Sequence, residues 1–259
     1  MPPAGITLSL ANKVAVVTGG SRGIGAATVK MFAAAGARVM FSYEKNKRAA
    51  DEVAAACGKE NCAARASNLD GPASAKKLIE AAVERFGRLD ALVANHGIWP
   101  AQDVSISDMS DAQWRRTVAI NLDSVFGLVK HATAQMKKQR SGGHVVLVSS
   151  TAGQRGEAFH CDYAATKGAM ISMVKGPSTE LAADGIYVNC VAPGWVDTDM
   201  AAPALNNADT RRRALEKIPL GRVATPEEIA APILFLCTAH AGFITGEIFN
   251  VNGGAVLVG

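Results

Sequence analysis

Tyr163 and Lys167 are the residues whose types and spacing point most directly to chemistry. Residues four apart lie on one face of a helix, so a phenol would lie beside an ammonium group. A tyrosine hydroxyl ordinarily has a pKa of about 10, and a neighbouring cation favours the phenolate and lowers that pKa. The pair therefore predicts a general acid/base that exchanges a proton with a substrate oxygen. For an isolated pair, an ordinary surface contact is the competing interpretation.

Two further polar positions favour the chemical interpretation. Ser149 and Ser150 end a predicted strand, at the carboxyl edge where doubly wound sheets bind ligands. Ser150 stands thirteen positions before Tyr163, and one of these two serines is a candidate to act with the phenol. Asn121 stands between apolar neighbours inside a predicted helix, where asparagine is unfavourable for helix formation, and this indicates a specific task.

A glycine-rich segment, Thr18-Gly19-Gly20-Ser21-Arg22-Gly23-Ile24-Gly25, follows the first predicted strand directly and opens a helix. Glycines at this junction permit a tight turn and let the backbone approach a pyrophosphate. The helix N-terminus adds N–H donors and the positive end of its dipole. The position between strand and helix favours a dinucleotide site over a turn that is merely rich in glycine.

The spacing of Gly19, Gly23 and Gly25 resembles the TGxxxGxG motif of the short-chain dehydrogenase/reductase family, and the resemblance extends from Lys13 to Gly254. It implies hydride transfer between a nicotinamide and a carbonyl or secondary alcohol. It also implies that Ser150 donates a hydrogen bond to the substrate oxygen and that Tyr163 exchanges the proton. Lys167 would hold the nicotinamide ribose and tune Tyr163, while Asn121 would hold a water that links Lys167 to solvent.

The same resemblance implies cofactor contacts at the ends of several strands. Asn68 matches the position that faces the adenine, and Asn95 and Gly97 keep their places in the family's Asn-Asn-Ala-Gly motif. His96 departs from that motif, and we interpret it either as a polar core residue or as part of the cleft near the cofactor. The predicted cofactor contacts are Gly19, Ser21, Arg22, Gly23, Ile24, Gly25, Ser42, Tyr43, Asn68, Leu69, Asn95, Gly97, Tyr163, Lys167, Pro193, Gly194, Val196 and Thr198.

The end of the second predicted strand bears on the choice between NADP and NAD. An acidic side chain there binds the ribose hydroxyls and disfavours the additional phosphate of NADP. Ser42 and Tyr43 occupy this position, and Arg22 in the glycine loop is placed to pair with a 2′-phosphate. We favour NADP(H), and NAD(H) remains the alternative because Glu44 follows directly.

Short apolar runs alternate with longer alanine-rich helical patterns along the chain. The predicted strands are Val14–Val17, Arg38–Tyr43, Cys62–Ser67, Leu89–Ala94, Val145–Ser149, Tyr187–Val191 and Ile248–Val251. The predicted helices are Gly23–Ala35, a helix ending at Cys57, Ala73–Phe86, Ser110–Gln139, Asp162–Asp184 and one from the capping box Thr225–Glu228 to Cys237. This alternation predicts right-handed crossovers and a parallel sheet.

We therefore expect the α/β fold class, with a Rossmann-type doubly wound parallel sheet of about seven strands. The expected domain organisation is a single dinucleotide-binding catalytic domain over residues 1–259, with an N-terminal extension over 1–11 and a substrate lid over 198–218. Within that lid, residues 198–211 lack a clear hydrophobic period, which predicts a mobile surface segment.

Composition and charge argue against several other classes of protein. With 49% hydrophobic and 19% charged residues, the chain can bury a substantial core. The net charge of +4 is scattered, which argues against nucleic-acid binding. Five cysteines without metal-type spacing indicate reduced thiols in a cytoplasmic protein and no metal site. Residues 1–10 do not resemble a signal peptide, and residues 229–246 contain Pro232, so we expect no membrane span.

The run from Pro193 to Met200 and the Asn252-Gly253-Gly254 segment are most similar to the 3-oxoacyl-(acyl-carrier-protein) reductase type. Thr179 replaces a basic residue of that type, and Pro177 should kink its helix or shift the hydrogen bonds. Both departures argue against docking of an acyl-carrier protein. A sugar, polyol or small-ketone dehydrogenase is the alternative. Candidate substrate-wall residues are Ile98, Trp99, Gln154, Arg155, His160, Trp195 and Met200, for which ordinary packing is the competing interpretation.

Two expectations concern the whole molecule. The long apolar helices over 110–139 and 162–184 pair between subunits in this family, so the resemblance implies a homotetramer that acts on a small-molecule carbonyl or alcohol. The alternative from another class is a catalytically silent dinucleotide-binding regulator. Such proteins lose the serine, tyrosine or lysine, whereas this chain keeps all three.

Overall fold

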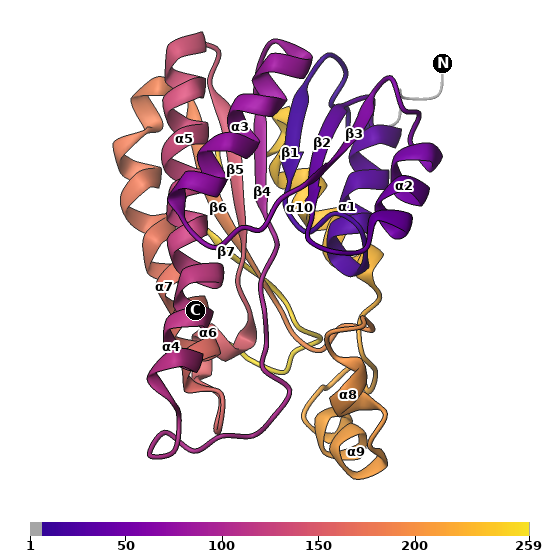
Figure 1. Ribbon diagram of the computed structural model, residues 1–259, viewed down its shortest axis with the longest axis vertical. Coiled ribbons are helices and arrows are strands. Elements are labelled where there is room, and N and C mark those ends of the chain that lie inside the picture. The colour runs from indigo at the N-terminus through magenta and orange to yellow at the C-terminus, as the bar shows by residue number, and fades with distance from the viewer. Residues whose placement is uncertain (1–6, 259) are drawn as a thin grey trace.

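The computed structural model describes residues 7–258 and is built around a parallel sheet of seven strands (Figure 1). The strands are β1 (Val14–Val17), β2 (Arg38–Tyr43), β3 (Cys62–Ala66), β4 (Ala91–Ala94), β5 (Gly143–Val148), β6 (Ile186–Pro193) and β7 (Ile248–Val251). Their order across the sheet is β3-β2-β1-β4-β5-β6-β7. The order reverses between β1 and β4, and ligands of such sheets bind at the carboxyl ends of the strands beside that point. The expected fold class is confirmed. Residues 1–6 of the expected N-terminal extension lie outside the described residues.

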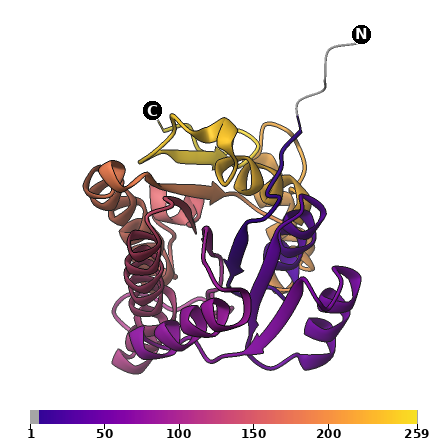
Figure 2. The same ribbon diagram turned by 90° about the horizontal axis from the view of Figure 1, so that it is seen from above.

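Helices cover both faces of this sheet (Figures 1 and 2). The longer ones are α1 (Gly23–Ala34), α2 (Lys47–Ala56), α3 (Pro72–Phe86), α4 (Asp111–Val118), α5 (Ser124–Gln139), α7 (Cys161–Glu180) and α10 (Pro226–Leu236). Along β1, Val14 and Val16 join the core beneath α3, α5 and α7, whereas Ala15 and Val17 join the core beneath α1, α2 and α10. Burial on both faces explains why the strands are continuous apolar runs.

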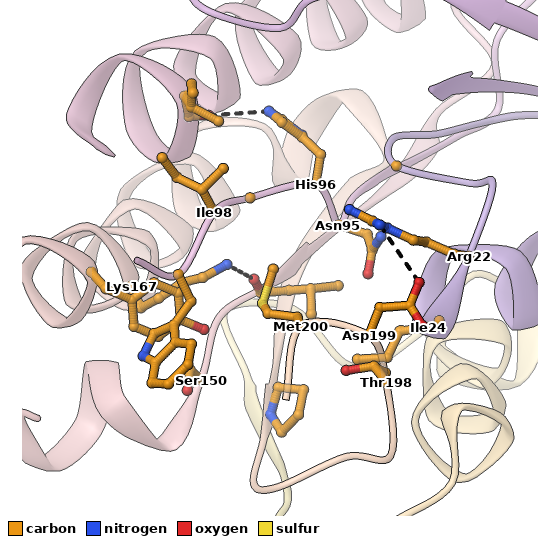
Figure 3. A pocket seen from close by; sticks show the side chains of 18 of the residues that line it. Arg22, Ile24, Asn95, His96, Ile98, Ser150, Lys167, Thr198, Asp199 and Met200 are labelled. Carbon is orange, nitrogen blue, oxygen red and sulfur yellow. Dashed lines mark hydrogen bonds and ion pairs between the residues drawn. The ribbon is translucent and has the colours of Figure 1, made fainter. Parts of the chain in front are cut away.

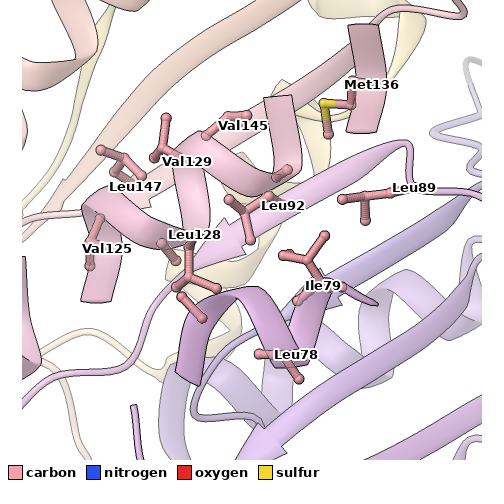
Figure 4. Close-up of a cluster of buried hydrophobic side chains, with 14 of the residues drawn as sticks. Leu78, Ile79, Leu89, Leu92, Val125, Leu128, Val129, Met136, Val145 and Leu147 are labelled. Atoms are coloured by element: carbon pink, nitrogen blue, oxygen red, sulfur yellow. The ribbon is translucent and has the colours of Figure 1, made fainter. Parts of the chain in front are cut away.

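The core beneath α3 and α5 fixes the part of the chain that leads to the site (Figure 4). Leu78 on α3 and Leu128 on α5 are completely buried, and burial of each leucine stabilises the fold by about 2 kcal/mol. Gly127 lets the two helices approach closely, because a Cβ there would lie 2.5 Å from the Cα of Pro72. The packing holds the start of α5 in place, directly after the segment that carries Asn121.

The two longest predicted helices differ from the structure in detail. The stretch over 110–139 consists of α4, a π-helical turn at Ala119–Asp123 and then α5. Such a turn adds a residue to one helical turn and is frequent at functional sites. The stretch over 162–184 ends as an α-helix at Glu180 and continues as a 3₁₀ turn. Pro177 does not end α7, since the helix continues for another three residues.

Three short helices have no counterpart in the hydrophobic pattern: α6 (Thr151–Arg155), α8 (Ala202–Leu205) and α9 (Ala208–Glu216). Two of them begin at polar caps: Ser150 caps α6, and the side chain of Asn207 at the start of α9 accepts the N–H of Thr210 at 3.0 Å. The segment 198–211 therefore has helical order where the sequence pattern shows no period. In Figure 1, α8 and α9 lie beyond the carboxyl ends of the strands, apart from the helical layers. None of the helices in the described range is long and apolar enough to cross a membrane.

Candidate active site

A cavity of about 760 Å³ opens at the carboxyl ends of the strands (Figure 3). Most predicted site residues line it, namely Gly19, Ser21, Arg22, Gly23, Ile24, Ser42, Tyr43, Asn68, Leu69, Asn95, Gly97, Ser150, Tyr163, Lys167, Pro193, Gly194, Val196 and Thr198. Gly25 and Asn121 are not among the lining residues. Of the substrate-wall candidates, Ile98, Trp99, Arg155, Trp195 and Met200 line the cavity, whereas Gln154 and His160 do not.

The glycine loop has the geometry of a cradle for a phosphate group. Gly19 and Gly23 adopt φ values of +67° and +52°, a region that favours glycine. A Cβ on Gly25 would overlap the carbonyl oxygen of Gly19, so the loop can close only with glycine there. No side chain caps the N-terminus of α1, so its first N–H groups remain available to an anion. These features fit the pyrophosphate of a dinucleotide.

Neighbouring strands hold this loop from both sides. The Ser42 hydroxyl on β2 accepts the N–H of Gly19 at 3.1 Å. The Asn95 side chain after β4 donates to the carbonyl of Thr18 at 2.9 Å. Ser42 and Asn95 thus support the loop, in addition to lining the cavity.

The side chains that bear on the choice between NADP and NAD are exposed and form only weak ion pairs. Arg22, with 69% of its side chain exposed, lies 3.5 Å from the Asp199 carboxylate. Lys45 lies 3.4 Å from Glu44 at the end of β2. All four residues line the cavity, and exposed pairs of this kind contribute at most about 1 kcal/mol. A phosphate can therefore displace the carboxylate partners at little cost.

His96 links the end of β1 to the π-helical turn. Thr18 Oγ1 accepts the N–H groups of Asn95 at 2.9 Å and His96 at 3.1 Å, and it is hydrogen-bonded to the Val93 carbonyl at 3.4 Å and to His96 Nδ1 at 2.8 Å. His96 Nε2 then donates to Ser124 Oγ at 2.7 Å, and that hydroxyl donates to the Ile120 carbonyl at 2.6 Å. Desolvation, and then the charge of Lys167, lower the pKa of His96 to about 4. A neutral imidazole is compatible with this series of hydrogen bonds. His96 therefore takes part in a buried polar network and also lines the cavity.

Asn121 sits in the π-helical turn and is completely buried. Its Oδ1 accepts the N–H of Ile98 at 2.8 Å, and its Nδ2 donates to the Ile98 carbonyl at 2.9 Å. A Cβ on Gly97 would lie 3.2 Å from Asn121 Oδ1 and 3.6 Å from Lys167 Nζ. The amide therefore fixes the backbone that passes in front of Lys167.

The expected lowering of the Tyr163 pKa is wrong for this structure. Burial raises the pKa of Tyr163 to about 12, a hydrogen bond with Ser150 opposes this, and the charge of Glu157 adds to it. The Lys167 ammonium lies 5.7 Å from the centre of the Tyr163 ring and donates to the Val148 carbonyl at 2.7 Å. Burial lowers the pKa of Lys167 to about 8. The two groups are adjacent, as the four-residue spacing predicts, but the cation points at a backbone carbonyl.

The two adjacent serines have different surroundings. Ser149 is buried, and its hydroxyl donates to the carbonyl of Lys167 at 2.7 Å. Ser150 lines the cavity, accepts the N–H of Ala152 at 3.1 Å as the cap of α6 and is hydrogen-bonded to Tyr163. Both serines line the cavity, but the Ser149 hydroxyl is engaged with the Lys167 carbonyl, whereas Ser150 is the serine that pairs with the phenol.

One lining residue that bears on the chemistry was missed by the sequence reasoning. Glu157 is half-buried in the wall, close enough to Tyr163 for its charge to raise the phenol pKa. It belongs to the irregular loop between α6 and α7, where periodicity carries no signal. Its position in the sequence between Ser150 and Tyr163 could have indicated it, because the loop that joins these two residues must lie next to both. Among residues 7–258, no three His, Cys, Asp or Glu side chains are grouped as metal ligands.

Comparison with known proteins adds independent support. A profile of the family described as enoyl-(acyl carrier protein) reductase matches residues 19–256. A 3-oxoacyl-(acyl-carrier-protein) reductase from Synechocystis is 39% identical over 253 residues, covering 96% of this chain and 99% of the relative.

Two solved structures are similar over almost their whole length. A Brucella melitensis structure described as a short-chain dehydrogenase/reductase, glucose/ribitol dehydrogenase, is 36% identical with a TM-score of 0.89, covering 98% of this chain and 100% of that chain. A structure from Agrobacterium tumefaciens with bound NADP is 30% identical with a TM-score of 0.88, covering 97% and 99%.

Proposed function

This chain belongs to the short-chain dehydrogenase/reductase family and is an NAD(P)-dependent oxidoreductase, and we propose that it interconverts a ketone and a secondary alcohol with NADP(H). The observation that carries the proposal is the meeting of Ser150, Tyr163 and Lys167 with an uncapped, glycine-lined helix start in one cavity. A bound dinucleotide would supply or accept the hydride, and the protein supplies orientation and charge.

The contacts of the side chains support the roles that we propose for them. Ser150 donates a hydrogen bond to the substrate oxygen, and Tyr163 protonates that oxygen in reduction or removes its proton in oxidation. Lys167, whose ammonium donates to the Val148 carbonyl, would hold the nicotinamide ribose of a bound dinucleotide, and its charge would also stabilise the phenolate. Asn121 holds the Ile98 backbone in front of Lys167 and so shapes the path by which protons reach it. The same four side chains argue against a silent regulator.

NADP is the proposed cofactor, with NAD as the alternative. Arg22 and Lys45 both line the adenosine end of the cavity, and Glu44 is offset by Lys45. The relative from Agrobacterium tumefaciens that was solved with NADP has the same fold. A 2′-phosphate would gain charge-assisted hydrogen bonds that a ribose hydroxyl does not offer.

The substrate belongs to one of two classes. A 3-oxoacyl thioester is favoured by the name of the Synechocystis relative, whereas a sugar or polyol is favoured by that of the Brucella relative. Thr179 at the end of α7 still argues against docking of an acyl-carrier protein. Oxidation of NADPH with acetoacetyl-N-acetylcysteamine, and reduction of NADP⁺ with ribitol or glucose, would separate the two classes.

The decisive experiment is Tyr163→Phe, which keeps the ring and removes the hydroxyl. We expect kcat to fall by about a thousandfold or more, since proton transfer contributes about 10²–10⁴-fold, while the dissociation constant for NADPH stays within threefold. Tyr187→Phe is the control, because Tyr187 stacks on His144 and does not line the cavity. Retained turnover in Tyr163→Phe, or tight NADPH binding with no turnover by the wild type on any substrate, would contradict the proposal.

Three properties of the whole molecule complete the proposal. Residues 198–218 act as a lid, because Met200 and Ala201 line the cavity at the foot of α8. The protein is a cytoplasmic homotetramer, in which α5 and α7 pair between subunits. Sedimentation analysis tests the assembly, and a monomer mass would contradict it.

A further inference from the structure

The substrate end of the cavity has an aromatic corner formed by Trp99, Trp195 and His160. The Trp99 indole stacks on the His160 imidazole, with ring centres 4.6 Å apart and planes 13° apart. Trp195 meets Trp99 at 81°, with ring centres 6.5 Å apart. His160 is only 3% exposed, and its Nε2 lies 3.9 Å from the carboxylate of Asp103. The two indoles line the cavity and are held in place before any substrate arrives.

Glu157 lies beside this corner, in the loop between α6 and the helix that carries the reacting phenol. Burial raises its pKa, while His160 and a hydrogen bond with the Trp99 indole favour the ionised form, as does Arg155. Its charge in turn contributes to the raised pKa of Tyr163. The residue is half-buried and lines the cavity.

An ionised carboxylate accepts hydrogen bonds and donates none. When a substrate displaces water from this wall, Glu157 loses the hydrogen bonds of that water, and a donor on the substrate would replace them. A 3-oxoacyl thioester offers only acceptor oxygens around its ketone. A sugar or polyol offers hydroxyl donors on the carbons next to the reacting one, and the C–H faces of its ring can pack on an indole.

We propose that Glu157 and the aromatic corner form a recognition site for a cyclic polyhydroxylated substrate, in which the hydroxyl adjacent to the reacting carbon donates to Glu157. This inference rests on the proposed oxidoreductase function and chooses between its two substrate classes. Glu157 is a specificity residue here, and Tyr163 remains the acid/base.

The test compares two alcohols that differ by one hydroxyl, cyclohexanol and trans-1,2-cyclohexanediol, in the reduction of NADP⁺. We expect the wild type to prefer the diol by at least about tenfold in kcat/KM, because a site built for a hydroxyl rejects the analogue that lacks it. Glu157→Gln should lower this ratio by about tenfold, and Trp99→Phe, which keeps a ring but loses the N–H, by about threefold. Glu84→Gln, an exposed carboxylate on α3, is the matched control and should keep the ratio.

The pH dependence of alcohol oxidation gives a second readout, which would not change if Glu157 had only a structural role. Because the Glu157 charge raises the pKa of Tyr163, Glu157→Gln should shift the rise of cyclohexanol oxidation to lower pH. Saturable quenching of tryptophan fluorescence by the diol, at lower concentrations than by cyclohexanol, tests binding without turnover or variants.

The outcomes separate this inference from the proposed function. Absence of turnover of both alcohols and of acetoacetyl-N-acetylcysteamine with either cofactor contradicts the function itself. Turnover of the thioester with no preference for the diol, a diol preference unchanged in Glu157→Gln, or equal quenching by the two alcohols overturns the inference alone.

Discussion

The two halves of the cavity are held together very differently. In the cofactor half, Thr18, Asn95 and His96 are joined by hydrogen bonds to one another, to the π-helical turn and to the start of α5. In the substrate half, Arg155 and Met200 line the wall while exposed to solvent. In the function we propose, the first half binds the cofactor, which is the same for every substrate. The second half consists of loops and short helices that can vary without disturbing the sheet.

This difference makes opposite demands on single side chains. Where the backbone itself binds the ligand, a methyl group added to a glycine collides with neighbouring atoms. The loss of a buried polar side chain there removes hydrogen bonds from the groups around it. Where exposed side chains bind the ligand, a substitution changes affinity for one substrate and little else. Substitutions in the two halves should therefore have effects of different size and kind.

The largest effect on cofactor binding is expected from Gly25→Ala in the cofactor half. The new Cβ would overlap the Gly19 carbonyl, so the glycine loop must open. We expect the dissociation constant for NADPH to rise by at least about a hundredfold, which corresponds to about 3 kcal/mol. Isothermal titration calorimetry measures it.

Gly176→Ala in α7 is the control, because a Cβ there meets nothing within 4 Å. Alanine in a helix is favoured over glycine by about 1 kcal/mol, so this variant should bind normally and melt slightly higher. Normal NADPH binding by Gly25→Ala would show that the glycine loop is not the cradle.

The second prediction concerns His96, which joins β1 to the π-helical turn. His96→Ala removes one hydrogen-bond partner each from the buried hydroxyls of Thr18 and Ser124, which keep their backbone partners, at a cost of about 0.5–1.5 kcal/mol for each lost hydrogen bond. We expect a lower melting temperature and a higher KM for NADPH. His96→Gln, which can donate to Ser124, should recover part of both. An unchanged melting temperature for His96→Ala would show that the hydrogen bonds of His96 do not stabilise the fold.

The acid stability of the wild type gives a third prediction about the same residue. The folded state lowers the pKa of His96 to about 4 from an ordinary 6.5, so between these values the unfolded chain binds more protons. Stability should therefore fall as pH decreases from 6.5 to 4. His96→Gln should flatten this slope without abolishing it, because His144, whose pKa is also lowered to about 4, retains its share. Urea denaturation at several pH values measures the slope.

The same contrast governs how much could be predicted from the sequence. The sheet and its strand ends follow from apolar runs and glycine spacing, and the capping box at Thr225 is present as predicted. The short helices α6, α8 and α9 carry too few turns for a period to emerge. The role of Glu157 depends on the fold of an irregular loop, and the direction of the Lys167 ammonium depends on a backbone carbonyl that no sequence pattern reveals.

The fourth prediction concerns Arg22, which joins the two halves because it belongs to the glycine loop and pairs with Asp199 in the proposed lid. Its pairing with Asp199 is exposed and weak, so a 2′-phosphate should replace it. We expect Arg22→Ala to raise the KM for NADPH by about tenfold, since hydrogen bonds to charged groups contribute about 1.5–3 kcal/mol, and to leave the KM for NADH within twofold. Equal changes for both cofactors would indicate a general loss of the loop rather than a lost phosphate contact.

The smallest effect is expected in the substrate half, from Met200→Ala. Met200 is 44% exposed, so its truncation leaves no cavity and should change the free energy of unfolding by no more than about 0.5 kcal/mol. Because it lines the cavity beside α8, we expect a change in KM for the alcohol of about threefold with NADPH affinity unaltered, since a few methylenes at a half-exposed wall contribute little. A drop in stability comparable to that of His96→Ala would erase the contrast, because the lid segment would then belong to the fold as firmly as the glycine loop does.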